Sequence, residues 1–416
     1  MESSTKKKML VVSSYNRPCG IAQYLEHLEP ELRNQSDFDV EIAALPVDLL
    51  RSEAKHARKL SEKAFNEILQ NAKDVDVVNI QFEPGLFGYT PFLIWKRLDK
   101  LINVSRRVIL TYHTVPLGTS VRFGFSKAAL KKYLNSWRGR YIFDRLFQKI
   151  RSNPDKFINI VQTKREAKGF ELLGLPKERI FDSPLAFLSV EQKKVFESER
   201  GNILLEVKRN YGAEGRLIGC FGFLSPYKGI EVAIRALKYL PQEYSLLVVG
   251  GLHPEGIEHG TVEQKYIKSL IEEIEADNLS MQKNSDPSRV AISGRVHFCG
   301  APDNLEFNRI MIACDSIVLP YAEVGQTSSG PAAIALDMNK SVYCSRTHCF
   351  RELDKYQKGI LSFFEVGNHM ELAERIRLSD GSREIRTEAR KEYSERYNVN
   401  TRAGLYKKAF EILVIS

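Results

Sequence analysis

The sequence has no segment with the length and apolar character that spanning a membrane requires. A membrane helix needs about 18 or more consecutive apolar residues, and no such run occurs. The N-terminal segment has only four consecutive apolar residues, Met9 to Val12, before Ser13, which is too few for the apolar core of a secretory leader. We therefore expect a cytoplasmic protein, either free or peripheral on the inner face of the membrane.

Cysteine is scarce, and its spacing is not that of a metal site. The six cysteines form no Cys-x-x-Cys pair, and most lie in apolar stretches such as 219–221 and 296–299. We interpret them as reduced core thiols rather than as disulfides or zinc ligands. The Asp-x-Asp sequence at 74–76 precedes an expected strand instead of following one, so we interpret it as a solvated turn. The sequence therefore predicts no bound metal.

Length and composition predict a folded protein of two domains. The chain has 416 residues, whereas single hydrophobic cores stop growing at roughly 250–300 residues. Its composition, 43% hydrophobic and 27% charged, excludes disorder over most of the chain.

Short apolar runs alternate with helical patterns along almost the whole chain. Strands are expected at 9–13, 40–44, 75–81, 107–112, 157–162, 217–221, 245–249, 295–299, 316–320 and 341–344. Helices are expected at 21–32, 52–71, 91–101, 229–240, 261–276, 304–314 and 328–337. This alternation predicts an α/β protein in which helices cover both faces of parallel sheets.

The alternation weakens after residue 176 and restarts at 217, which divides the chain. We expect two doubly wound, Rossmann-like domains, one over residues 1–190 and one over 200–375, joined near 185–200. Residues 376–416 are expected to form helices that pack back across the domains. Ligands bind beyond the carboxyl ends of the strands in such sheets, so the site is expected there, in a cleft between the domains.

Three residues of the N-terminal half stand just after expected strands. Gly20 precedes a helix, whose free N–H groups favour anions. Glu83 and His113 follow the third and fourth strands and place a carboxylate and an imidazole at the same edge. A turn glycine and a structural histidine are the alternatives, and the convergence of all three residues favours a ligand site.

Two loops of the C-terminal half have the composition of phosphate-binding turns. Lys228 stands at a helix start, where the helix dipole normally favours acids, so a cation there indicates a phosphate that neutralises both. Ser328 and Ser329 stand where a later strand leads into a helix, and hydroxyl and N–H groups suit a phosphate at that position. A solvated lysine and an N-capping serine are the alternatives.

These motifs together resemble the retaining glycosyltransferases of family four. The matching segments are CGIA (19–22), IQFEPGLFG (80–88), YHT (112–114), FGFLSPYKGIEVAIRAL (221–237), SLLVVGG (245–251), VHFCG (296–300) and CDSIVLPYAEVGQTSSGPAAIAL (314–336). That family has the GT-B fold, two Rossmann-like domains with a cleft between them. The resemblance implies that residues 1–190 form the acceptor-side domain and 200–375 the domain that binds the nucleotide-sugar donor.

The resemblance also implies roles for individual residues. His113 and Glu323 would contact the transferred sugar, and Lys228 would hold the donor diphosphate; these three are the expected catalytic residues. Donor binding would involve Lys228 and Glu323 together with Gly20, in a loop that closes over the donor, and with the hydroxyls of Ser328 and Ser329. Glu83 is expected on the acceptor side.

Two positions depart from the family's pattern. Pro331 occupies the position of the second glutamate of a conserved pair, so the usual contact with the nucleotide ribose does not carry over. Phe223 occupies the position of a basic residue, which leaves Lys228 as the cation of its loop.

The resemblance implies transfer of a sugar from a nucleoside diphosphate sugar, with retention of configuration and without a metal or other cofactor. The acceptor would be a lipid-linked glycan or a polysaccharide. A sugar transferase acting on nucleic acid and a nucleotide-sugar epimerase of the same fold are the alternatives. A phosphorylase is disfavoured because the chain has no long insert with a pyridoxal-phosphate lysine.

Positive charge is concentrated in one segment. The net charge is +9, and residues 121–151 carry nine basic side chains against one acid, Asp144. Apolar residues recur there at helical spacing, with Gly139 as a break between two helical pieces. We expect an amphipathic helix on an anionic membrane surface, with Arg138 and Arg145 on the acceptor side. A helix packed into its domain and a nucleic-acid surface are the alternatives.

Overall fold

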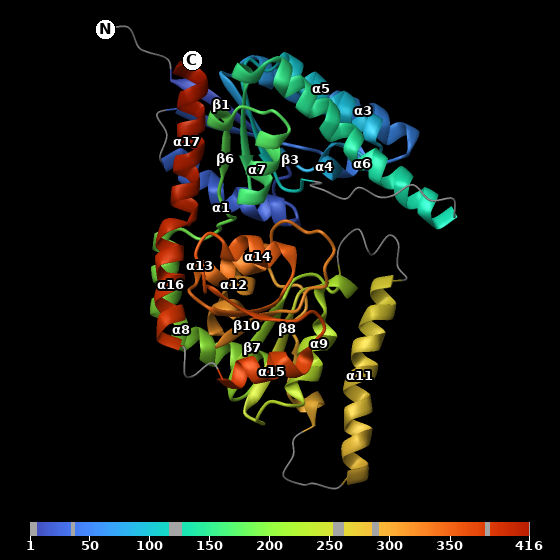
Figure 1. Ribbon diagram of the computed structural model, residues 1–416, viewed down its shortest axis with the longest axis vertical. Helices are drawn as coiled ribbons and strands as arrows, with labels where there is room; N and C mark the ends of the chain where they lie inside the picture. The colour runs from blue at the N-terminus through green and yellow to red at the C-terminus, as the bar shows by residue number, and fades with distance from the viewer. Residues whose placement is uncertain are drawn as a thin grey trace. The chain divides into compact units, whose positions relative to one another are not determined.

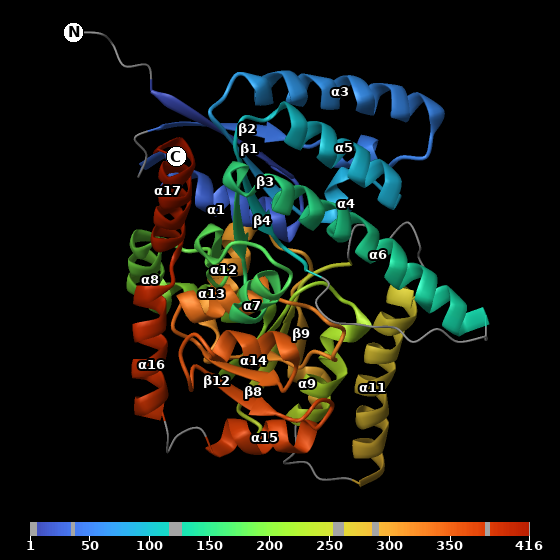
Figure 2. The same ribbon diagram turned by 45° about the horizontal axis from the view of Figure 1, so that its top comes forward.

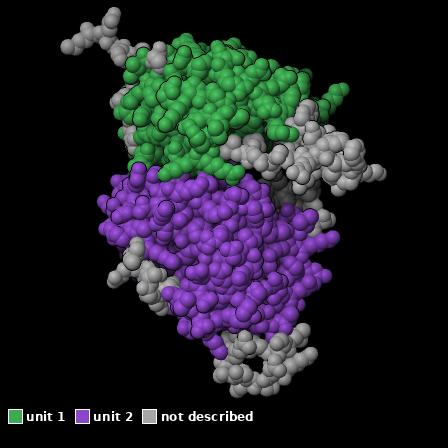
Figure 3. Space-filling view, viewed as in Figure 1, with its two compact units in different colours: residues 1–184, 399–416 green, residues 185–398 purple. Residues whose placement is uncertain are grey.

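The structure, a computed structural model, describes residues 6–34, 38–115, 127–252, 262–284, 291–378 and 383–415. The chain forms two compact units (Figure 3). Unit 1 comprises Met1–Pro184 and Val399–Ser416, and unit 2 comprises Leu185–Asn398. Each unit contains one six-stranded sheet in which every strand pair is parallel.

The sheet of unit 1 has the order β2-β1-β3-β4-β5-β6. Its strands are β1 (Lys7–Ser13), β2 (Phe38–Ala44), β3 (Val77–Phe82), β4 (Val108–Tyr112), β5 (Phe157–Val161) and β6 (Ile180–Asp182). Its helices are α1 (Gly20–Asn34), α2 (Val47–Arg51), α3 (Lys55–Lys73), α4 (Pro84–Phe87), α5 (Pro91–Val104), α6 (Lys127–Ser152), α7 (Lys164–Leu172) and α17 (Val399–Ile415). The strand order reverses between β1 and β3, so the loops after these two strands diverge.

The sheet of unit 2 has the order β12-β11-β10-β7-β8-β9. Its strands are β7 (Arg216–Phe221), β8 (Tyr244–Val249), β9 (Val296–Phe298), β10 (Ser316–Leu319), β11 (Ser341–Ser345) and β12 (Leu361–Phe364). Its helices are α8 (Val190–Tyr211), α9 (Ile230–Leu237), α11 (Val262–Asn284), α12 (Asn304–Ala313), α13 (Gly330–Asp337), α14 (His348–Asp354), α15 (His369–Arg377) and α16 (Arg383–Arg396). Here the order reverses between β7 and β10.

The central strands are buried along their whole length because helices cover both faces of each sheet. All residues of β3, β4 and β8 are buried, which explains their continuous apolar runs. Strands β3 and β4 also contain three polar residues that are fully buried: Asn79, Gln81 and Thr111. Such groups require hydrogen-bond partners inside the protein.

Helix α17 belongs to unit 1 although it follows the whole of unit 2 in the sequence. It lies beside α1 (Figures 1 and 2), and Phe410 stacks on Phe38 of β2 with the ring centroids 4.1 Å apart. A helix from a distant part of the chain therefore packs in unit 1 beside α1 and against β2.

Some elements differ from the sequence-based expectations. The predicted break at Gly139 is wrong, because α6 runs as one helix from Lys127 to Ser152. Helix α8 was not predicted, although Ser189 and Gln192 form a capping box at its start. Strands β6 and β12 were also missed; they have only three and four residues, too few to show a period. Within the described ranges, no helix is both long and apolar enough to cross a bilayer.

Candidate functional site

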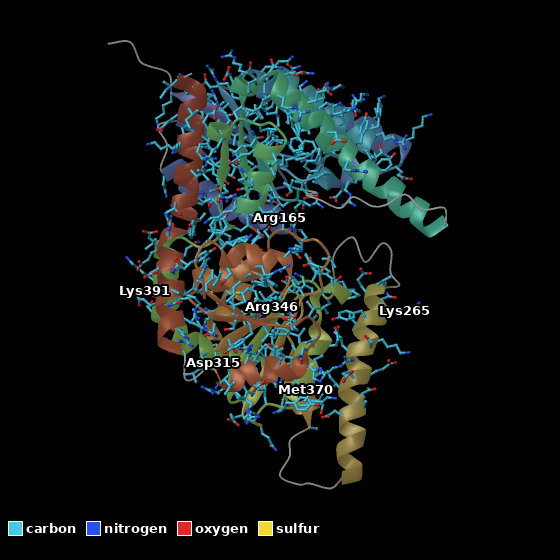
Figure 4. The ribbon with its side chains drawn as sticks, in the orientation of Figure 1. Arg165, Lys265, Asp315, Arg346, Met370 and Lys391 are labelled. Atoms are coloured by element: carbon cyan, nitrogen blue, oxygen red, sulfur yellow. The ribbon has the colours of Figure 1, made fainter. Side chains whose placement is uncertain are left out.

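The loops after β7 and β10 flank the reversal of strand order in unit 2. Asp315 precedes β10 and Arg346 follows β11, so these two side chains mark the opposite edges of one parallel sheet (Figure 4). At the edge of Arg346, the N–H group of Ala322 donates to the carbonyl of Tyr227 over 2.8 Å and joins the two loops. A switch point of this kind is where doubly wound sheets bind ligands.

Lys228 is a buried cation at this edge. It ends the short 3₁₀ turn Pro226–Lys228 after β7, and the residue is 5% exposed. Its Nζ lies 3.8 Å from the ring centroid of Tyr321 and 4.9 Å from that of Tyr227. Among the described residues, Nζ has no carboxylate or carbonyl partner. Burial lowers the pKa of Lys228 to about 8.

Two glycines in the loop of Lys228 have positive φ values that other residues rarely adopt. Gly229 has a φ of +64°, and a Cβ there would lie 2.1 Å from the carbonyl oxygen of Pro320. Gly222 has a φ of +126°, and its Cβ would lie 3.0 Å from Cε of Lys228. The backbone therefore fixes the position of the ammonium group.

Glu323 is exposed in the loop after β10, and both of its carboxylate oxygens have partners. Oε1 accepts from the N–H of Gly325 over 3.1 Å, and Oε2 accepts from the N–H of His348 over 2.7 Å. His348 is the first residue of α14, whose N-cap residue Thr347 makes no side-chain hydrogen bond. Glu323 thus stabilises the start of α14 and the shape of its own loop.

The two serines before α13 differ in their surroundings. Ser329 is the N-cap residue: its Oγ accepts from the N–H of Ala332 over 3.4 Å and lies 3.1 Å from the hydroxyl of Tyr321. At 3% exposure, its hydroxyl serves the helix. Ser328 is partly exposed, and its carbonyl accepts from the side chain of Gln326. Pro331 lies in the first turn of α13, where its missing N–H removes no helical bond.

In unit 1, Gly20 is the first residue of α1, at the loop after β1. A Cβ at Gly20 would meet no described atom within 4 Å. The local fold therefore does not require glycine, and the space beside it is open to an approaching group.

His113 follows β4 and is half-buried. Its Nε2 lies 2.9 Å from Oε1 of Gln81, and its ring packs edge-on against Tyr24 with the centroids 5.6 Å apart. Burial, reinforced by the positive charge of Arg402, lowers the pKa of His113 to about 3. The imidazole is therefore neutral at physiological pH and hydrogen-bonds as a neutral group.

Glu83 is the partly buried residue that precedes α4. Burial raises the pKa of its carboxyl, while hydrogen bonds from the Thr114 side chain and the Gly85 backbone act in the opposite direction. The link to Thr114 ties Glu83 to the loop of His113.

Helix α6 carries the two arginines predicted on the acceptor side. Arg145 is exposed, and its guanidinium lies over the ring of Tyr141 at 4.7 Å from the centroid. The side chain of Arg138 lies outside the described residues. Five apolar residues of the second half of α6 are buried in the core of unit 1; they are Ile142, Phe143, Leu146, Phe147 and Ile150. This half of the helix therefore has no apolar face left for a membrane.

The structure thus groups the predicted residues in two clusters. Lys228 and Ser329 both contact Tyr321, and Glu323 lies in the same loop. In unit 1, His113 contacts Tyr24 on the helix that Gly20 begins. In the described part of the chain, no three His, Cys, Asp or Glu side chains are grouped to hold a metal ion.

Sequence analysis missed the immediate partners of both clusters. Tyr227 and Tyr321 both stand inside the motifs quoted above, but only Tyr227 is next to Lys228 in the sequence, so only Tyr227 gave a signal. Gln81 was also within a motif, as the one long polar side chain of an apolar strand. Nothing in the local sequence marks Arg402 as a neighbour of His113.

Comparison with solved structures identifies the fold. HepE from Anabaena in complex with UDP-glucose has 18% identity and a TM-score of 0.59, over 97% of this chain and 99% of that chain. A glycosyltransferase from Rickettsia africae has 14% identity and a TM-score of 0.62, over 98% and 99%. Sucrose-phosphate synthase from Thermosynechococcus elongatus has 16% identity and a TM-score of 0.60, over 97% and 99%.

The chain therefore has the GT-B fold of two doubly wound, Rossmann-like domains, and the predicted fold class is confirmed. No protein-family profile and no curated protein matches its sequence.

Proposed function

We propose that this protein is a glycosyltransferase that moves a sugar from a nucleoside diphosphate sugar to an acceptor. Lys228 carries the proposal: it is a buried ammonium at the switch point of unit 2, without an anionic partner among the described residues. A buried charge is costly until an opposite charge compensates it, and a diphosphate supplies that charge. The UDP-glucose complex of HepE supports a uridine nucleotide as the first donor to test.

Lys228 would act on the leaving group. When the bond between the sugar and the diphosphate breaks, negative charge develops on the diphosphate and positive charge on the anomeric carbon. An ammonium fixed by its backbone stabilises that negative charge more in the transition state than in the ground state. The N–H groups at the start of α13, with Ser328 beside them, would add to this effect. We propose that these groups stabilise the diphosphate without a metal ion.

His113 and Glu323 would orient the transferred hexosyl group. A neutral imidazole can contact sugar hydroxyls without adding a charge to the site. Glu323 already binds two backbone N–H groups, so it would position its loop against the sugar as well as contact it. Gly20 would admit the donor to the start of α1, and Glu83 would lie on the acceptor side. Retention of configuration is proposed from the resemblance to family four.

We propose that the acceptor is a lipid-linked glycan or a polysaccharide presented at an anionic membrane surface. The concentration of positive charge in residues 121–151 supports it. Because the apolar residues of the second half of α6 are buried, attraction there would be electrostatic and would involve exposed bases such as Arg145. Each base near such a surface contributes about 1 kcal/mol.

Vesicle sedimentation tests the membrane proposal. Binding to anionic but not zwitterionic vesicles is expected, and it should be lost when Lys131, Lys132, Arg138 and Arg145 are replaced by Glu. Equal sedimentation of the two proteins would contradict it.

Incubation with a panel of nucleotide sugars tests the activity. UDP-glucose is expected to raise the melting temperature and to be consumed when an acceptor glycan is present, with no loss on addition of a chelator. Proton NMR of the product should show the anomeric configuration of the donor. Isomerisation of the nucleotide sugar without an acceptor would identify an epimerase, and labelled sugar appearing on nucleic acid would identify the other alternative.

A further inference from the structure

A group of buried polar side chains connects His113 to helix α17. Asn79, Gln81 and Thr111 are fully buried in β3 and β4, and Tyr406 of α17 covers them. The hydroxyl oxygen of Tyr406 lies 2.9 Å from Oγ1 of Thr111 and 3.3 Å from Nε2 of Gln81. Buried polar groups form hydrogen bonds with one another, and some of them can only donate or only accept. The direction of each bond can therefore be deduced from the groups that it joins.

The direction is set at Arg402, a guanidinium that can only donate. Arg402 is 1% exposed; its Nε donates to the hydroxyl oxygen of Tyr24 over 2.8 Å, and its Nη1 donates to the carbonyls of Ser183 and Pro184. Tyr24 therefore accepts from Arg402, and its own proton is available to the hydroxyl oxygen of Tyr406, 3.1 Å away.

The same direction continues into the sheet. Tyr406 accepts from Tyr24 and donates to Thr111 over 2.9 Å. Thr111 then donates to Oδ1 of Asn79 over 3.4 Å, and this oxygen also accepts from Nε2 of Gln81 over 3.2 Å. When the bonds run this way, each hydroxyl of the series and the Gln81 amide group have an acceptor, whereas Nη2 of Arg402 makes no hydrogen bond to a described residue.

The series fixes the amide of Gln81. Nδ2 of Asn79 faces Sδ of Met9 at 4.0 Å, which directs Oδ1 of Asn79 toward Gln81. Nε2 of Gln81 donates to this oxygen and to Tyr406, so exchanging the nitrogen and oxygen of the Gln81 amide would place two acceptor oxygens against each other. Oε1 of Gln81 must therefore face His113. An amide oxygen only accepts, so the proton of the imidazole must be on Nε2, 2.9 Å away, and Nδ1 carries the lone pair.

The electrostatic surroundings favour the same neutral ring. The ionisable groups next to the imidazole are Tyr24 on α1 and Arg402 and Tyr406 on α17, with Glu83 held at Thr114 of the adjoining loop. Arg402 has no carboxylate partner among the described residues, and its positive charge acts with burial to lower the pKa of His113.

We propose that Arg402 and Tyr406 are positioning residues that hold His113 as the neutral tautomer with its proton on Nε2. In this state the protonation and the orientation of the ring are set before a sugar binds. The inference rests on the proposed function for that contact, whereas the tautomer is a property of the free protein.

Nitrogen-15 NMR of the histidine-labelled protein reads the tautomer without any activity assay, and His113→Asn assigns the signals. The wild type should show a protonated Nε2 and an unprotonated Nδ1 that do not titrate between about pH 5 and 8. Tyr406→Phe should produce a mixture of tautomers, and Arg402→Gln should raise the pKa of His113, because a positive charge beside the buried ring is removed. Tyr112→Phe, which removes a buried hydroxyl bonded to Asn159 outside the series, is the control and should leave the signals unchanged.

Kinetics supply a second measurement. Tyr406→Phe is expected to lower kcat about threefold to tenfold with little change in donor KM, because one hydrogen bond of orientation is lost. An unchanged Nε2–H tautomer in both Tyr406→Phe and Arg402→Gln would overturn the inference; if Arg402→Gln does not fold, Tyr406→Phe alone decides.

The two proposals can fail separately. The expected tautomer without any sugar transfer would refute the proposed function and leave the positioning role supported. Sugar transfer by a protein whose His113 titrates near its ordinary pKa would refute the positioning role.

Discussion

Both sheets place candidate residues directly after their strands, but the surroundings of these residues differ in charge and in hydrogen bonding. His113 of unit 1 is neutral and joins a hydrogen-bonded series that closes within the protein. Lys228 of unit 2 is a cation held between two aromatic rings, and its surroundings supply no described counter-charge. The hydrogen bonds around His113 form without a ligand, whereas the charge of Lys228 has no described group to compensate it. We therefore expect affinity for the nucleotide to depend mainly on unit 2 and orientation of the sugar mainly on unit 1.

The largest expected effect is that of removing the charge of Lys228. Lys228→Met keeps an apolar stem between Tyr227 and Tyr321 and removes only the ammonium. Affinity for UDP, measured by calorimetry, should fall by about 10–150-fold, since a hydrogen bond to a charged group contributes about 1.5–3 kcal/mol. The exposed lysine Lys268 provides the control Lys268→Ala, which should bind normally. Wild-type affinity in Lys228→Met would refute the assignment.

The site of Lys228 should show a pH dependence that the site of His113 lacks. Burial lowers the pKa of Lys228 to about 8, so the ammonium that we propose binds UDP is lost above that pH. Affinity should fall by up to about tenfold per pH unit above 8 in the wild type, and Lys228→Met should show no such decline.

Folding stability should respond to Lys228 with the opposite sign. Between pH 8 and the ordinary lysine value of 10.5, the unfolded chain retains a proton that the folded chain has released. The unfolded state thus binds more protons in this interval, so this residue makes the free energy of unfolding rise with pH. Denaturant titrations of the wild type and Lys228→Met at pH 7.5 and 9.5 measure the difference, and identical pH slopes would contradict it.

A smaller effect is expected at Glu323, where folding and function overlap. Glu323→Ala removes the acceptor for the N–H groups of Gly325 and His348, and about 1 kcal/mol of stability should be lost, as for an N-cap. Donor turnover should fall further than this loss explains. Glu323→Gln, which keeps one acceptor oxygen, should recover part of the stability; if turnover is normal in both variants, the residue is only structural.

The smallest expected effect is on stability at Gly20. Gly20→Ala adds a Cβ to open space at a helix start, so its free energy of unfolding should change by less than about 1 kcal/mol. Gly229→Ala, its counterpart in unit 2, should be strongly destabilised because the Cβ would overlap the carbonyl of Pro320. Thermal unfolding of both variants checks this, and equal melting temperatures would show that the two loops do not differ as described.

The features that could be predicted from the sequence are those that depend on residues close together in the chain. The buried strands were visible as apolar runs, and Lys228 was identifiable because its strand, turn and helix are consecutive. The surroundings that give these residues their properties come from elsewhere in the chain. Tyr321 reaches Lys228 from the loop after β10, and Arg402 reaches His113 from α17. A charged residue in a charge-rich terminal segment reads as a solvated surface residue, so only the tertiary fold reveals that Arg402 is buried.

The position of α17 in the chain has a consequence for biosynthesis. Strands β1 to β6 leave the ribosome before any part of unit 2, yet Tyr406 and Arg402, which satisfy their buried polar groups, are translated after all of it. Unit 1 is therefore translated first and completed last, which reverses the usual order in which an N-terminal domain folds during synthesis. Throughout the translation of unit 2, the nascent sheet must keep Asn79, Gln81 and Thr111 hydrated or bound by a chaperone.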